Sequence, residues 1–196
     1  MGTARPDPAA AAMAAHVVVL LDRSGSMVDG VDGYISGFNA FVDAQRAAGA
    51  RVSLYLFDER AERVLDCVPA ADVPPLTRAT YRLGGSTALY DAIGAALALA
   101  LGGPPGVCAV LTDGQDNASR THTRDSARAA IAAAEAEGWT FAFLAANRDA
   151  FDAVSGLAAA GLYSVFDPQA SAEAFDTMNE MVTELVTRSN TNGSAP

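Results

Sequence analysis

Two uninterrupted apolar segments that each lead into an aspartate most constrain the fold of this 196-residue chain. Residues 17–21 read Val-Val-Val-Leu-Leu and are followed by Asp22, and residues 107–111 read Val-Cys-Ala-Val-Leu and are followed by Thr112 and Asp113. Apolar segments of this length without polar alternation are typical of strands that are covered on both faces. Such strands occur in parallel sheets flanked by helices, so the two segments predict an α/β fold.

The remaining segments alternate between helical and strand-like patterns. Apolar residues at helical spacing predict helices over residues 31–48, 88–101, 123–137, 150–159 and 170–187. Strand-like patterns cover residues 16–22, 51–58, 61–68, 107–112, 139–145 and 162–166. Only a short turn separates the second strand from the third, so these two form an antiparallel hairpin. The whole pattern predicts a doubly wound, mostly parallel six-stranded sheet with this hairpin at one edge and helices on both faces.

Length and cysteine content indicate a single intracellular domain. A chain of 196 residues suits one domain with a full core. Residues 1–14 and 190–196 are interpreted as flexible tails, and residues 15–189 as the domain. The two cysteines, Cys67 and Cys108, lie in apolar strand-like segments and are interpreted as reduced, buried side chains, which favours a cytoplasmic location.

Charge and hydropathy limit the class of partner. The chain carries 13 basic and 23 acidic residues, for a formal net charge of -10. Nucleic acids and anionic membrane surfaces select basic patches, so neither is an expected partner. No segment reaches about 18 consecutive apolar residues, so no membrane span is expected. The net negative charge favours a cation or a basic protein surface as the partner.

Three short polar segments stand where predicted strands end or a predicted helix begins. Residues 22–26 (Asp-Arg-Ser-Gly-Ser) offer one carboxylate and two hydroxyls at alternate positions. Residues 84–87 (Gly-Gly-Ser-Thr) place a hydroxyl at a helix start, and residues 113–114 (Asp-Gly) follow a buried strand. Ligands of open α/β sheets bind outside the carboxyl ends of the strands. Hard oxygen donors that carry little charge suit magnesium or manganese better than zinc.

The order of these segments closely resembles the metal-ion-dependent adhesion site (MIDAS) of von Willebrand factor type A (vWA) domains, here of the stand-alone bacterial type. The resemblance extends from about residue 16 to about residue 188, and every position of the motif is present. It implies the strand order 3-2-1-4-5-6 and a bound Mg²⁺ or Mn²⁺. The residues that carry over as metal-site residues are Asp22, Ser24, Ser26, Thr87 and Asp113.

The resemblance also implies how the site works. Ser24 and Ser26 coordinate the ion with a third ligand from Thr87 or Asp113, and Asp22 acts through water and through hydrogen bonds to the serine hydroxyls. An ion with so few charged groups among its direct ligands keeps most of its positive charge and attracts a carboxylate from outside. A protein partner that presents an Asp or Glu would complete the shell, so the chain is expected to be a binding adaptor and not an enzyme.

Two other classes of function, an enzyme and a structural subunit, remain as alternatives. A phosphotransferase with a nucleophilic Asp22 needs a second acid two residues on and a downstream lysine, but Ser24 stands at that place and the chain has no lysine. A serine hydrolase needs a Gly-x-Ser-x-Gly elbow, which the sequence lacks. A structural subunit with a vestigial site is opposed by the complete five-residue set. Among nearby polar residues, Asp91 is expected to turn toward the loop backbone, and residues 147–149 are candidates for the border of the ligand groove.

Overall fold

The computed structural model describes residues 15–100 and 103–192 and contains the predicted sheet. Its six strands follow the order β3-β2-β1-β4-β5-β6, which confirms the predicted doubly wound order. The strands are β1 (His16–Asp22), β2 (Arg51–Phe57), β3 (Ala61–Pro69), β4 (Val107–Thr112), β5 (Thr140–Ala145) and β6 (Leu162–Val165). The β2–β3 pair is antiparallel and lies at one edge, and the other four pairings are parallel.

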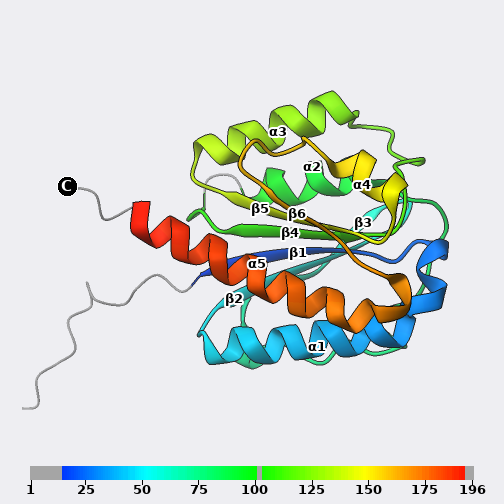
Figure 1. Ribbon diagram of the computed structural model, residues 1–196, viewed down its shortest axis with the longest axis horizontal. Coiled ribbons are helices and arrows are strands. Elements are labelled where there is room, and N and C mark those ends of the chain that lie inside the picture. The colour runs from blue at the N-terminus through cyan, green and yellow to red at the C-terminus, as the bar shows by residue number, and fades with distance from the viewer. Residues whose placement is uncertain (1–14, 101–102, 193–196) are drawn as a thin grey trace, which may run out of the picture.

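Helices cover both faces of the sheet (Figure 1). One face carries α1 (Val31–Ala47) and α5 (Ser171–Asn192), which run side by side. The other carries α2 (Leu89–Ala100), α3 (Arg124–Ala136) and α4 (Arg148–Val154). Short 3-10 turns join these elements: η2 (Gly25–Gly30), η3 (Ala70–Asp72) and η4 (Pro168–Ala170).

The sheet separates two hydrophobic cores, because alternate side chains of a strand point to opposite faces. In β1, Val17, Val19 and Leu21 join the core beneath α1 and α5, and Val18 and Leu20 join the core beneath α2 and α3. β1 is therefore buried on both faces, as its apolar sequence predicts. Strand β2 shows the same double burial despite its alternating sequence. Helices above and below the sheet leave its central strands no solvent-facing side.

Two helices, α4 and α5, differ from the sequence prediction at their ends. Helix α4 begins at Arg148 because the Asn147 side chain accepts a hydrogen bond from the Ala150 amide, two residues before the predicted start. Helix α5 continues to Asn192 and so includes residues 190–192 of the expected C-terminal tail, and residues 1–14 and 193–196 lie outside the described part of the chain. The division into domain and tails stays a prediction. Within the described ranges, no helix combines the length and apolar character that crossing a membrane requires.

Candidate metal site

The sheet brings the two site aspartates together. Strands β1 and β4 pair in parallel with Leu21 opposite Leu111, so their carboxyl ends lie at the same edge. Asp22 is the last residue of β1, and Asp113 directly follows β4. Two carboxylates that are 91 positions apart in the sequence therefore meet at the edge where open α/β sheets bind ligands.

The two serines continue from Asp22 toward Asp113. The Ser24 and Ser26 hydroxyl oxygens lie 3.2 Å apart, and the Ser26 hydroxyl donates to Asp113 Oδ1 at 2.6 Å. Neighbouring ligands of an octahedral magnesium shell lie about 3.0 Å apart, given metal–oxygen distances of about 2.1 Å. The spacing of the serine oxygens therefore suits two adjacent ligands of one ion. Ser24 is buried, whereas Ser26 is exposed and opens the site to solvent.

Asp22 is fully buried and rigidly held. The Ser24 amide donates to its Oδ1 at 2.7 Å, and the Thr112 hydroxyl donates to its Oδ2 at 2.6 Å. Burial raises the pKa of Asp22 to about 6, although both hydrogen bonds favour the charged form. The structure differs from the sequence expectation in one respect: Asp113, and not Asp22, accepts the hydrogen bond of the Ser26 hydroxyl.

The second carboxylate also resists ionisation. Burial raises the pKa of Asp113, and the nearby charge of Asp29 adds to this effect, while the Ser26 hydroxyl opposes it. Asp113 in turn raises the pKa of Asp22. A cation placed between these groups would favour the charged form of both carboxylates. The electrostatics of the site therefore suit a positively charged ligand.

Thr87 reaches the site from the segment that precedes α2. A Cβ atom added to Gly114 would lie 3.3 Å from the Thr87 hydroxyl oxygen and 3.9 Å from that of Ser26. Both hydroxyls therefore face the same glycine, whose lack of a side chain leaves room between them. The Thr87 amide donates to the Asn117 side chain at 2.8 Å, and its carbonyl accepts from the Asn117 amide at 2.9 Å. All five predicted residues thus come to one edge of the sheet.

The first and second loops are joined through their backbones. The Gly25 amide donates to the Gly85 carbonyl at 2.9 Å, and the Gly84 amide donates to the Arg23 carbonyl at 2.7 Å. A Cβ atom on Gly84 would lie 2.0 Å from Asp58 Oδ2, which is too close for any side chain. The glycine pair therefore allows the close approach that fixes the serine loop beside the threonine loop.

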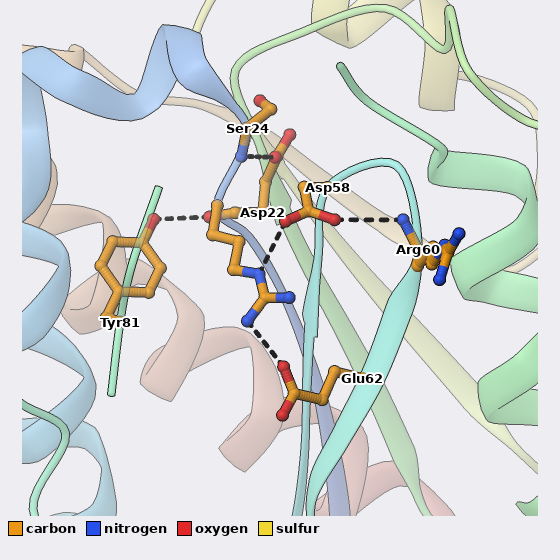
Figure 2. A network of polar contacts seen from close by, with 7 residues as sticks. Asp22, Ser24, Asp58, Arg60, Glu62 and Tyr81 are labelled. Carbon is orange, nitrogen blue, oxygen red and sulfur yellow. Dashed lines mark hydrogen bonds and ion pairs between the residues drawn. The ribbon is translucent and has the colours of Figure 1, made fainter. Parts of the chain in front are cut away.

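The serine loop is supported by an ion-pair network of three charged residues and by one tyrosine (Figure 2). The Arg23 guanidinium donates to Asp58 at 3.0 Å and to Glu62 at 2.8 Å, which ties the serine loop to the β2–β3 hairpin. The buried Tyr81 hydroxyl donates to the Asp22 carbonyl at 2.5 Å. Sequence reasoning missed these supports. The turn after β2 offered a weak signal, but nothing in the sequence pairs it with Arg23.

Two polar residues near the site have structural roles. Asp91 accepts the amides of residues 120–122, which confirms the expected turn toward the loop backbone. Asn147 caps α4, and its side-chain amide also donates to the Asp113 carbonyl. It therefore borders the site by holding the backbone of Asp113.

The donor set suits a hard cation and not zinc. Residues 15–100 and 103–192 contain no cluster of three or more His, Cys, Asp or Glu side chains arranged for a metal. The candidate site instead combines three hydroxyls with two carboxylates. Hydroxyl and carboxylate oxygens are donors that magnesium and manganese accept, so these residues fit the metal that the motif implies.

Comparisons with known proteins agree on the fold. The family model described as "VWA domain containing CoxE-like protein" matches residues 3–187. A von Willebrand factor type A protein from Catenulispora acidiphila superposes with a TM-score of 0.65 at 21% identity, over 85% of this chain and 42% of that one. This chain therefore spans less than half the length of that protein. No curated protein sequence matches.

Two bacterial pilus proteins share the same fold. The vWF domain of the type V pili tip protein Mfa5 from Porphyromonas gingivalis has a TM-score of 0.66 at 12% identity, over 87% of this chain and 95% of that one. The PilB minor pilin from Streptococcus sanguinis has a TM-score of 0.66 at 13% identity, over 92% of this chain and 64% of that one. Such low identities show the fold alone. The family match covers nearly the whole chain, and the chain therefore belongs to the family of VWA domain containing CoxE-like proteins.

Proposed function

We propose that this protein is a metal-dependent protein-binding module whose MIDAS-type site holds Mg²⁺ or Mn²⁺. The observation that carries the proposal is the hydrogen-bonded series from Asp22 through Ser24 and Ser26 to Asp113. These residues place hydroxyls at the spacing of adjacent ligands beside two carboxylates whose ionisation burial opposes. Domains of the vWA type are generally interaction modules and not enzymes.

The five site residues would have two different roles. Ser24, Ser26 and either Thr87 or Asp113 would hold the ion, and Asp22 would orient the loop through its bonds to the Ser24 amide and Thr112. When bound, a divalent ion with few charged ligands supplies a strong positive charge for an incoming carboxylate. Because Ser26 is exposed, the partner would approach the site from its side.

The partner would be a protein that presents an Asp or Glu carboxylate. The net charge of -10 favours a partner whose surrounding surface is neutral or basic. Val28 lies two residues after Ser26 and is 59% exposed, so it offers an apolar contact beside the ion. Nucleic acid and membrane surfaces are not part of the proposal. A cytoplasmic location is part of it, because Cys67 and Cys108 are free cysteines. No contact in the site favours the two alternatives, an enzyme or a structural subunit with a vestigial metal site.

Metal binding by the isolated protein tests the first half of the proposal. We expect the wild-type chain to bind Mn²⁺, measured by the loss of the free-ion electron paramagnetic resonance signal, and to release it when Mg²⁺ is added. Ser26→Ala should abolish this binding. Ser36→Ala is the matched control, because the Ser36 side chain is exposed and its hydroxyl donates to the Gly33 carbonyl of its own helix. A wild-type chain that leaves the Mn²⁺ signal unchanged at millimolar concentration would contradict the proposal.

Capture of a partner tests the second half. Immobilised wild-type protein should retain its partner in Mg²⁺ and release it in EDTA, and Asp22→Ala should retain none. The captured protein should lose its affinity when one particular acidic residue is changed to its amide. A partner that stays bound in EDTA, on protein shown beforehand to hold metal, would mean that another surface recognises it.

A further inference from the structure

Tyr34, in the first turn of α1, has an unpaired hydroxyl. Its side chain is 0% exposed, and the hydroxyl has no hydrogen-bond partner among the residues that the structure describes. Buried hydroxyls are normally bonded, and a phenylalanine would fill the same space without the cost of an unpaired polar atom. The metal site as described above does not use this group, so its presence needs a reason.

The Tyr34 ring packs against the turn η2, which also carries Ser26. Its Cε2 and Cζ atoms lie 2.6 and 2.7 Å from the point where a Cβ atom of Gly30 would be, so the ring packs against the end of η2. It contacts Tyr81 edge to face, with ring centroids 6.4 Å apart, and it contacts Phe166 at 6.2 Å. Because η2 runs without a break from Ser26 into α1, a movement of Ser26 would reach Tyr34 through four residues.

The Tyr34 hydroxyl lies in the electrostatic field of the site carboxylates. Burial raises the pKa of Tyr34 most strongly, and the negative charges of Asp113, Asp22 and Asp29 raise it further. The phenol therefore stays protonated and can act as a donor toward this acidic region. The neighbouring Tyr81 shows what a phenol can do there, because its hydroxyl supports the site by donating to the Asp22 carbonyl.

We propose that Tyr34 is a positioning residue of the metal site, whose hydroxyl donates a hydrogen bond to the carboxylate side of the site only when the ion is bound. This inference rests on the proposed metal-binding function. Binding of a cation at Ser24 and Ser26 would draw the turn η2 and the carboxylates together, and the Tyr34 hydroxyl is a buried, unpaired donor in a side chain that packs against the end of η2. The new hydrogen bond would then couple metal affinity to the position of α1.

Tyr34→Phe in the 196-residue chain separates this role from a purely structural one. We expect the variant to bind Mn²⁺ about fivefold more weakly than the wild type, as the loss of one net hydrogen bond predicts. In EDTA its urea unfolding midpoint should equal or exceed that of the wild type, because the unpaired hydroxyl is gone. Adding Mg²⁺ to the wild type should also give a tyrosine near-ultraviolet difference signal that the variant lacks.

Thr140→Val is the matched control. It also removes a buried, unpaired hydroxyl, but Thr140 begins β5, at the opposite end of the strands from the metal site. This variant should keep the wild-type Mn²⁺ affinity. Equal affinities of Tyr34→Phe and wild type would overturn the inference and leave the proposed function standing. A lower unfolding midpoint of Tyr34→Phe in EDTA would also overturn it, because the hydroxyl would then be bonded without metal. If the wild type bound no metal, both proposals would fail.

Discussion

Burial controls the behaviour of Asp22 at the scale of the single residue. Its pKa of about 6 in the folded chain lies above the ordinary value of 3.8, so the folded state holds this proton more tightly than the unfolded state. The contribution of Asp22 to stability is therefore most favourable below about pH 4 and is lost as the pH rises to about 6. The loss amounts to about 3 kcal/mol, at about 1.4 kcal/mol for each pH unit.

Asp22→Asn should remove this pH dependence. The neutral amide can accept the Ser24 amide and donate to the Thr112 hydroxyl, so we expect the metal-free variant to be more stable than wild type at pH 8. Urea unfolding in EDTA between pH 4.5 and 8 measures the difference. Asp91→Asn is a control in which the pKa is shifted the other way. Burial raises the pKa of Asp91, but three backbone amides together outweigh burial and lower it. That variant should lose stability at pH 8. A less stable Asp22→Asn protein at pH 8 would show that the charged carboxylate is needed for folding.

Ser26→Ala should separate function from folding. The Ser26 side chain is exposed, so we expect its free energy of unfolding in EDTA to stay within about 1 kcal/mol of wild type while metal binding is lost. Circular dichroism during urea unfolding checks the first expectation, and Mn²⁺ titration checks the second. Unfolding of the variant at much lower urea would mean that the hydrogen bond to Asp113 holds the fold together.

The elements that sequence reasoning located well are those decided by local pattern. β1 and β4 are apolar over residues 17–21 and 107–111, and the burial of these residues follows from that pattern alone. The strand order came from the resemblance to vWA domains and not from periodicity. The Arg23–Asp58 pair could not be predicted, because it depends on how two distant loops approach after folding. The start of α4 was missed because Asn147 was interpreted as a groove residue and not as a cap.

Val19→Asp tests the central strand. Val19 is completely buried between β2 and β4, so an unpaired carboxylate there should unfold the domain. Val28→Asp is the matched control, because Val28 is 59% exposed. We expect a cooperative thermal transition for Val28→Asp and none for Val19→Asp. A folded Val19→Asp protein would contradict the central position of β1.

Gly84→Ala tests the contact between the two loops. The added methyl would lie 2.0 Å from Asp58 Oδ2, so the loop or the Arg23–Asp58 pair must move. We expect a loss of about 1–3 kcal/mol in the free energy of unfolding, measured with urea. Ser86→Ala, an exposed change in the same loop, should have little effect. Equal stabilities of the two variants would mean that the loop accommodates the methyl freely.

At the scale of the whole molecule, metal binding should appear as stability. A ligand that binds only the folded state raises the free energy of unfolding by about 2.7 kcal/mol at a hundred times its dissociation constant. The thermal midpoint of the wild type should therefore rise with Mg²⁺ concentration and return to its starting value in EDTA. Ser26→Ala should show no such rise. A wild-type midpoint that is independent of Mg²⁺ would contradict the proposed site.

The chemical make-up of the site has a consequence for where the protein can work. Its five residues carry neither sulfur nor imidazole, the side chains that oxidants modify and that copper or nickel prefer. Cys108 lies on β4, the strand that leads into Asp113, but its side chain is buried. Oxidants and traces of copper or nickel should therefore leave the proposed metal site intact. The fraction of metal-bound protein would instead depend on the magnesium concentration and on the presence of a partner that also coordinates the ion.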